Sequence, residues 1–154
     1  MSLQRLTSGP LTLGLELALD NDWSPAGEAA RLRDGRAFGV PDLSEHLQRV
    51  QLADRLGFRA LWLRDVPLYD PHFGDAGQVF EMFTYLGYLA ASTQHALLGT
   101  AAAVLPLRMP WLVRKAAASV QQLSGDRLLL GVASGDRPVE YPLFGIPFEQ
   151  RGEA

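Results

Sequence analysis

Three groups of residues that are suited to ligand binding or proton transfer lie in or directly after the last part of a short apolar run. Asp65 comes two residues after the run ALWL. The alanines Ala101–Ala103 lie within the apolar stretch that begins at Leu97, and Ala133, Ser134 and Gly135 close the next such stretch. In α/β proteins, ligands bind at the carboxyl ends of the parallel strands. The sequence therefore predicts a ligand site where these groups meet.

Two residues of the predicted site carry ionisable side chains and are candidate catalytic residues. The carboxylate of Asp65 could orient a substrate or accept a proton. An alternative is that Asp65 pairs with a neighbouring arginine or accepts hydrogen bonds from loop amides. His72 follows in the next loop and could supply a second proton-transfer group, unless it is simply solvated there.

The small residues suggest contact with a ligand through the backbone. Alanines at 101 and 102 let the main chain approach a flat ring, although they would also fit a crowded interior. The Ser134 hydroxyl and exposed N–H groups beside it suit an anion. An alternative for Gly135 is a turn with positive φ. Arg108, in the segment PLRMP, either faces the ligand or caps a helix end.

The elements that must position these residues alternate along the chain. We predict strands over 11–19, 60–63, 97–104 and 128–132, and helices over 43–56, 78–92 and about 110–123. Such alternation predicts a parallel sheet with helices outside it. Residues 1–10 are expected to form an N-terminal tail and 11–154 one domain. Residues 21–41 form a polar loop that is either functional or mobile.

Local signals refine two of these helices. Asp42 and Glu45 have the spacing of a capping box at the start of the first helix, whose inward face would carry Leu47, Val50 and Ala53. In the helix near 110–123, the residues that recur at helical spacing are Leu112, Ala116, Val120 and Leu123. His46 and His95 are expected on helices, away from the site.

Composition narrows the function classes. The chain has 154 residues, a net charge of −3, no cysteine and 47% hydrophobic residues. An acidic chain with no basic block argues against nucleic-acid binding. Without cysteine there are no disulfides or zinc–thiolate sites, and the three histidines are not spaced as metal ligands. No run is long enough to span a membrane, so we expect a soluble, cytoplasmic protein without a bound metal.

Taken together, three segments resemble the bacterial-luciferase-like flavin-dependent monooxygenases. They are LGTAAAVLPLRMPWLVRKAAASVQQLSGDRLLLGVASG, FGIPFEQRGEA and DLSEHLQRVQLADRLGFRALWLRD. The resemblance extends over residues 11–154. It implies a TIM (β/α)8 barrel, of which this chain holds the first four β/α units, a half-barrel. It also implies a flavin-dependent oxidoreductase that oxidises a small organic substrate with O2 and reduced FMN or, in one branch, uses the deazaflavin F420.

The resemblance also assigns roles to the predicted site. Ala101 and Ala102 match the position of a non-prolyl cis peptide against the flavin ring. Ser134 and Gly135 match a rim near the flavin or its phosphate, which the second half of such barrels mostly holds. The family often has a histidine after the acidic residue that matches Asp65, and this sequence has Val66 there.

Because the chain holds half of the predicted barrel, two statements about its association and function follow. We expect a homo-oligomer, or pairing with a C-terminal half that completes the barrel. The alternative function is a truncated or non-catalytic half-barrel that associates through exposed sheet edges and does not turn over alone.

Overall fold

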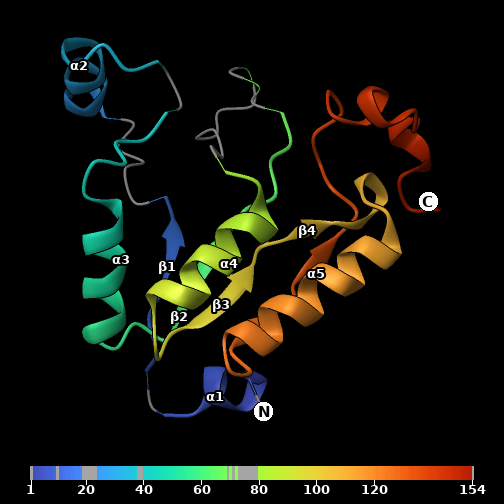
Figure 1. Ribbon diagram of the computed structural model, residues 1–154. Helices are drawn as coiled ribbons and strands as arrows, with labels where there is room; N and C mark the ends of the chain where they lie inside the picture. The colour runs from blue at the N-terminus through green and yellow to red at the C-terminus, as the bar shows by residue number, and fades with distance from the viewer. Residues whose placement is uncertain are drawn as a thin grey trace.

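The structure, a computed structural model, describes residues 2–9, 11–18, 24–37, 40–68, 70, 72 and 80–153 (Figure 1). Its elements, in chain order, are α1 (Ser2–Thr7), β1 (Gly14–Leu17), α2 (Pro25–Arg33), α3 (His46–Arg55), β2 (Ala60–Leu63), α4 (Met82–Ser92), β3 (Leu97–Thr100), β4 (Ala103–Val104), the 3-10 turn η1 (Leu105–Leu107), α5 (Pro110–Leu123), β5 (Leu128–Leu129), β6 (Val132–Ala133), and the 3-10 turns η2 (Tyr141–Phe144) and η3 (Phe148–Gln150).

The main sheet has four strands in the order β1-β2-β3-β5, and every pairing is parallel. The prediction of an α/β fold with a parallel sheet is therefore confirmed. The carboxyl ends of these strands share one edge of the sheet, as parallel pairing requires. The strand tip expected near Asp20 lies outside the described residues.

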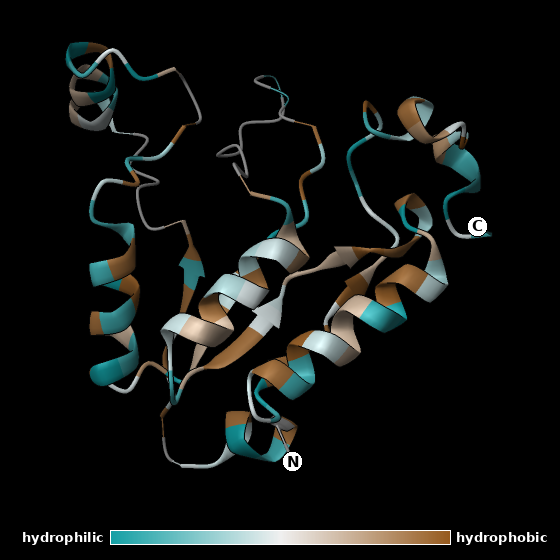
Figure 2. Cartoon of the chain, viewed as in Figure 1, coloured by the Kyte–Doolittle hydropathy of each residue, from teal (hydrophilic) through white to brown (hydrophobic). Residues whose placement is uncertain are grey.

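Helices α3, α4 and α5 pack on one face of the sheet and share one core with it. This core joins Val50 of α3, Leu86 of α4 and Val120 of α5 to Leu61 and Leu98 of the central strands. Figure 2 shows strands that are largely hydrophobic beside helices that alternate between hydrophobic and hydrophilic residues. Burial of the apolar stripe of each helix against the strands is the main stabilising term of this fold.

On the opposite face of the sheet a tryptophan lies over two glycines. Trp62 of β2 is in register with Gly99 of β3, and its ring occupies the space that side chains at Gly14 and Gly99 would need. Glu16 is in register with Trp62 on the other side. Glycine on both sides of Trp62 therefore lets its ring lie flat across the sheet.

Two of the predicted strands are interrupted, which corrects the prediction of continuous strands over 97–104 and 128–132. Residues 101 and 102 separate β3 from β4, and residues 130 and 131 separate β5 from β6. Beyond the break β4 pairs with β6 in a small parallel sheet of its own. Gly131 lies at the junction, where its carbonyl accepts hydrogen bonds from the Thr100 hydroxyl and the Ala103 N–H.

At the opposite end of the strands a buried carboxylate organises the turn into β3. Asp54 accepts hydrogen bonds from the N–H groups of Gln94, His95 and Ala96 at 2.7–3.0 Å. Burial by itself would raise the pKa of Asp54, but the three amide donors outweigh it and the pKa is lowered. His95 therefore lies in this turn, and the expectation that it is helical is wrong.

Local details of three helices also differ from the predictions. The polar loop 21–41 contains α2, whose N-cap is Ser24. No capping box forms between Asp42 and Glu45, because Asp42 accepts a hydrogen bond from the Ser44 N–H and α3 begins later, at His46.

The inward face of α5 is also rotated from the predicted one. Val113 and Val120 are buried there, whereas Leu112 and Leu123 are exposed. No helix in the described part of the chain is both long and apolar enough to cross a bilayer. Residues 2–7 of the predicted tail form α1.

Candidate functional site

A pocket of about 590 Å³ lies at the carboxyl ends of the strands. We call it the strand-end pocket. Its lining residues are Glu16, Arg64, Asp65, Val66, Ala101, Ala102, Val104, Ala133, Ser134, Gly135, Asp136 and Arg137. Five of the six predicted site residues are among them, and the exception is His72. The tertiary structure therefore gathers groups that are spread over 70 residues of sequence.

The two alanines form the part of the pocket between β3 and β4. The peptide bond between Ala101 and Ala102 is cis. The Ala101 N–H donates to the Leu63 carbonyl at 2.7 Å, so the segment is fixed to the end of β2. Ala101 is exposed and Ala102 half-buried, so main chain and methyl groups face the pocket with no larger side chain between.

On the other side of the pocket, the segment after β6 is held by residues that come later in the chain. The Tyr141 hydroxyl donates to the Ser134 carbonyl, and Arg151 Nε donates to the Gly135 carbonyl at 3.2 Å. Gly135 has φ +82°, and a side chain there would overlap the Tyr141 hydroxyl and approach Val104. Gly135 thus has the positive φ that was the alternative for this residue, and its contact with a ligand stays a prediction.

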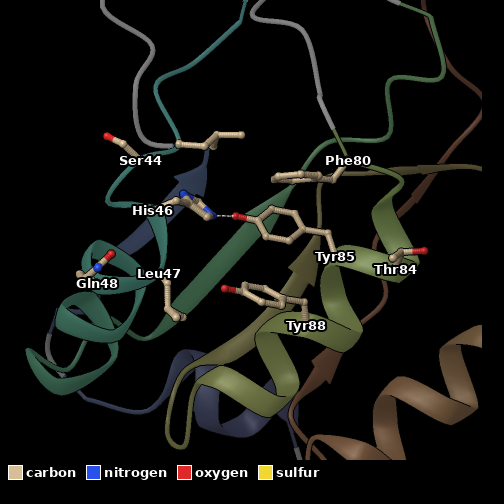
Figure 3. Close-up of a pocket in the computed structure, with 9 residues that line it drawn as sticks. Ser44, His46, Leu47, Gln48, Phe80, Thr84, Tyr85 and Tyr88 are labelled. Carbon is tan, nitrogen blue, oxygen red and sulfur yellow. Dashed lines mark hydrogen bonds between the residues drawn. The ribbon is translucent and has the colours of Figure 1, made fainter.

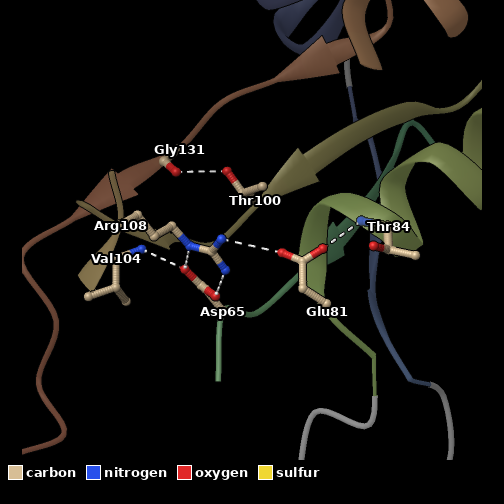
Figure 4. Close-up of polar contacts among 7 residues, drawn as sticks. All are labelled: Asp65, Glu81, Thr84, Thr100, Val104, Arg108 and Gly131. Atoms are coloured by element: carbon tan, nitrogen blue, oxygen red, sulfur yellow. Dashed lines mark hydrogen bonds and ion pairs between the residues drawn. The ribbon is translucent and has the colours of Figure 1, made fainter. Parts of the chain in front are cut away.

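Asp65 pairs with an arginine and accepts a hydrogen bond from a backbone amide, which was the alternative prediction for this residue. Its Oδ2 atom accepts hydrogen bonds from the Val104 N–H at 2.9 Å and from Arg108 Nε at 2.7 Å (Figure 4). Its Oδ1 atom accepts from Arg108 Nη2 at 2.5 Å. The side chain is only 2% exposed although it belongs to the pocket wall. The proposed role of Asp65 in proton transfer stays a prediction.

Arg108 joins Asp65 to the start of α4. Its Nη1 atom lies 3.3 Å from Glu81 Oε1. Glu81 is the N-cap of α4, and its side chain accepts a hydrogen bond from the Thr84 N–H. The hydrogen bond with Asp65 raises the pKa of Arg108, against the effect of burial. The sequence left the position of this arginine open, and the structure places it on two carboxylates.

Two further ion pairs lie around the pocket, and the sequence did not predict either of them. Arg64 forms an ion pair with Glu16 at 2.5 Å, across β2 and β1. Arg137 donates to Glu140 at 2.9 Å and to the Leu68 carbonyl at 3.1 Å. Burial raises the pKa of Glu140, and Arg137 opposes that shift. The i, i+3 spacing in DRPVE was the available signal for the second pair.

His72 does not reach the strand-end pocket among the described residues. Its side chain is 93% exposed and lies 3.3 Å from Asp70, whose carboxylate also accepts the His72 N–H. This is the solvated position given above as the alternative for His72. Its catalytic role stays a prediction.

A second pocket, of about 530 Å³, lies between α3 and α4 (Figure 3). We call it the aromatic pocket, and it is lined by Leu43, Ser44, His46, Leu47, Gln48, Phe80, Thr84, Tyr85 and Tyr88. The buried ring of His46 is hydrogen-bonded to the Tyr85 hydroxyl. His46 is thus helical and away from the strand ends, as predicted, but it lines a pocket that the sequence did not indicate.

The sequence profile of the luciferase-like monooxygenases matches residues 22–154. The match extends over most of the chain and includes every residue of the strand-end pocket except Glu16. The chain therefore belongs to the luciferase-like monooxygenase family, as the sequence resemblance indicated.

Two relatives illustrate the range of the family. An uncharacterized protein of Mycobacterium tuberculosis H37Rv is 28% identical in an alignment 136 residues long, and this alignment covers 79% of this chain and 47% of the relative. The F420-dependent glucose-6-phosphate dehydrogenase of Beutenbergia cavernae is 37% identical over 98 residues, 63% of this chain and 28% of that protein. The chain thus spans about half the length, or less, of the curated relatives it matches.

Two solved structures share the fold. The monooxygenase RslO1 of Streptomyces bottropensis superposes with a TM-score of 0.72 at 20% identity, over 93% of this chain and 39% of that one. The oxygenating constituent of 3,6-diketocamphane monooxygenase of Pseudomonas putida, in complex with FMN, gives a TM-score of 0.65 at 16% identity, over 90% and 34%.

Proposed function

We propose that this chain is the N-terminal half of a luciferase-like (β/α)8 barrel and carries part of the site of a flavin-dependent monooxygenase. The complete protein would oxidise a small organic substrate with O2 and reduced flavin. One observation carries the proposal: the small residues after β3 and β6 and the carboxylate after β2 line a single pocket at the strand ends.

The strand-end pocket fits a flavin in size and in chemistry. A volume of about 590 Å³ is in the range of pockets that hold cofactors. The wall formed by Ala101 and Ala102 offers main chain and methyl groups to the flat ring. Ser134 and the N–H groups near Gly135 would lie toward polar or anionic parts of the cofactor. The bound flavin supplies the redox chemistry, and the protein orients it and limits access of water.

FMN is the proposed cofactor, and F420 is the alternative. A structure with this fold is a complex with FMN, and a relative at 37% identity is named as F420-dependent. Both cofactors have a tricyclic ring that the alanine wall would accept. The two differ in the tail beyond the ring, so binding of each to the purified chain discriminates between them.

The test is a titration of the chain with FMN and with F420, followed by fluorescence. Ala101→Val adds bulk at an exposed position of the pocket wall, and Ala118→Val makes the same change on the exposed surface of α5. We expect Ala101→Val to weaken binding about tenfold or more through overpacking against the ring, and Ala118→Val to have no effect. Equal affinities for both variants would contradict a flavin at this wall.

The alternative is a half-barrel that associates through its sheet edges without turnover. Within the described part of the chain, strands β1 and β5 are the two edges of the main sheet, and Val132 of β6 is 52% exposed. Exposed edges and apolar side chains of this kind favour association. Sedimentation velocity tests it: a dimer that does not quench FMN fluorescence supports this alternative, and a monomer that binds FMN contradicts it.

A further inference from the structure

The main-chain pairing beside β2 changes at the wall of the strand-end pocket. The Ala101 N–H donates to the carbonyl of Leu63, the last residue of β2. Three residues later the Val104 N–H donates to the side chain of Asp65 instead. The carboxylate therefore takes the place of a strand carbonyl at the point where β4 has left the main sheet to pair with β6.

A fork of two hydrogen bonds fixes this carboxylate. Arg108 Nε and Nη2 each donate to one oxygen of Asp65, at 2.7 and 2.5 Å (Figure 4). With the Val104 N–H, three donors converge on one carboxylate that is 2% exposed. Planar bidentate pairs of this kind define orientation as well as distance.

We propose that Asp65 and Arg108 are a positioning pair that sets the backbone of residues 101–104 for a flat cofactor in the strand-end pocket. This inference rests on the proposed function for the identity of the cofactor. Asp65 acts through the Val104 N–H, and Arg108 acts through Asp65. Neither residue then needs to exchange a proton with the substrate.

A positioning pair and a catalytic carboxylate differ in the effect that is expected when both residues are substituted. Arg108→Gln leaves the buried Asp65 carboxylate without its cation, and Asp65→Asn leaves the half-buried Arg108 with Glu81 as its carboxylate partner. In the double variant, the Asn amide can accept from Val104 and donate to the Gln side chain, so a neutral pair replaces the ionic one. The two substitutions should therefore compensate each other, which a double-mutant cycle measures.

Two measurements follow the pair in the wild-type chain, the two single variants and the double variant. One is FMN affinity, together with the visible spectrum of the bound flavin. The other is hydrogen exchange of the Val104 amide by NMR, which needs no flavin. We expect each single variant to bind FMN about tenfold more weakly and the double variant to bind about threefold or more tighter than either single variant. The Val104 amide should exchange about tenfold faster in the single variants and recover in the double variant.

Glu81→Gln is the matched control, because Glu81 also contacts Arg108 but not Val104. It should leave Val104 exchange unchanged. If Asp65→Asn does not fold, Arg108→Lys takes its place, since it keeps the charge and loses the fork. Unchanged Val104 exchange and FMN affinity in Arg108→Lys would contradict the pair.

Normal Val104 exchange and normal FMN affinity in Asp65→Asn, with no compensation by Arg108→Gln, would overturn the proposal. Failure of the wild-type chain to bind FMN or F420 contradicts the proposed function instead. In that case, hydrogen exchange of the Val104 amide in the wild-type chain, the two single variants and the double variant still tests whether Asp65 and Arg108 position β4.

Discussion

The strand-end pocket and the aromatic pocket are similar in volume but are built in different ways. The strand-end pocket is made of main chain, small residues and ion pairs that come from the ends of several strands. The aromatic pocket is made of side chains from the start of α3, the start of α4 and the segments before them. Ring contacts of Tyr85 with Phe80 and Tyr88 account for much of its wall.

Because of this difference in construction, we expect the strand-end pocket to bind a ligand and the aromatic pocket to contribute to stability. Backbone groups at strand ends are fixed by the sheet, so the strand-end pocket can orient a ligand. The aromatic pocket lies between two helices that pack on the outside of the sheet, and the buried His46–Tyr85 pair stabilises that packing. We therefore expect substitutions in the first pocket to alter flavin binding and substitutions in the second to alter stability alone.

The largest effect is expected for Gly135→Ala. The alanine would keep a positive φ and would place its Cβ 2.7 Å from Val104 Cγ1 and onto the Tyr141 hydroxyl. Left-handed backbone costs an L-residue about 1 kcal/mol, and overpacking adds about 2 kcal/mol. We expect a loss of about 3 kcal/mol in urea unfolding followed by circular dichroism, together with loss of FMN binding.

Gly145→Ala is the matched control for the free-energy cost of placing alanine at a positive φ. Gly145 has φ +69°, and apart from its two chain neighbours no residue of the described chain comes within 4 Å of the position its Cβ would take. It should lose about 1 kcal/mol and retain FMN binding. Similar losses in the two variants would show that packing at Gly135 does not shape the strand-end pocket.

An intermediate effect is expected in the aromatic pocket, and it depends on pH. Burial and then the charge of Arg49 lower the pKa of His46 below its ordinary 6.5. The unfolded chain therefore binds the proton more tightly, and the stability that the neutral ring contributes is complete above pH 6.5 and is lost as the pH falls below it. His46→Gln should flatten the fall in unfolding free energy between pH 7.5 and about 5.

Tyr85→Phe tests the same pair without a change of charge. Loss of the hydrogen bond to His46 should cost about 1 kcal/mol at pH 7.5 and leave FMN affinity unchanged. His95→Gln, at an exposed histidine, is the control for the pH dependence. A change of FMN affinity in Tyr85→Phe would remove the distinction between the two pockets.

The smallest effect is expected for Ser134→Ala. The side chain is exposed, and the hydrogen bond from Tyr141 goes to the carbonyl, so stability should change by less than about 0.5 kcal/mol. If the hydroxyl contacts the cofactor phosphate, FMN binding weakens by about threefold and riboflavin binding does not. Ser119→Ala on α5 is the control, and an equal effect on FMN and riboflavin would exclude a phosphate contact.

The order of the main-sheet strands and of helices α3, α4 and α5 was predictable from the sequence, and so were the small residues at the strand ends. Apolar runs and helical spacing report local burial, which is why the parallel sheet was predictable from the strands near Ala60 and Leu97. The same signal placed Ala101, Ala102, Ser134 and Gly135 at strand ends, where the structure brings them together.

The side-chain partners of the site were not predictable from the sequence, because they come from distant parts of the chain. Arg108 is 43 residues from Asp65, and Tyr85 is 39 residues from His46, so no local pattern links either pair. The breaks after β3 and β5 also depend on the neighbouring strand, because β4 follows β6 once the main-sheet pairing ends. A polar side chain in a buried position takes whichever partner the fold brings within reach, and that partner is set by strand adjacency, which residue spacing does not encode.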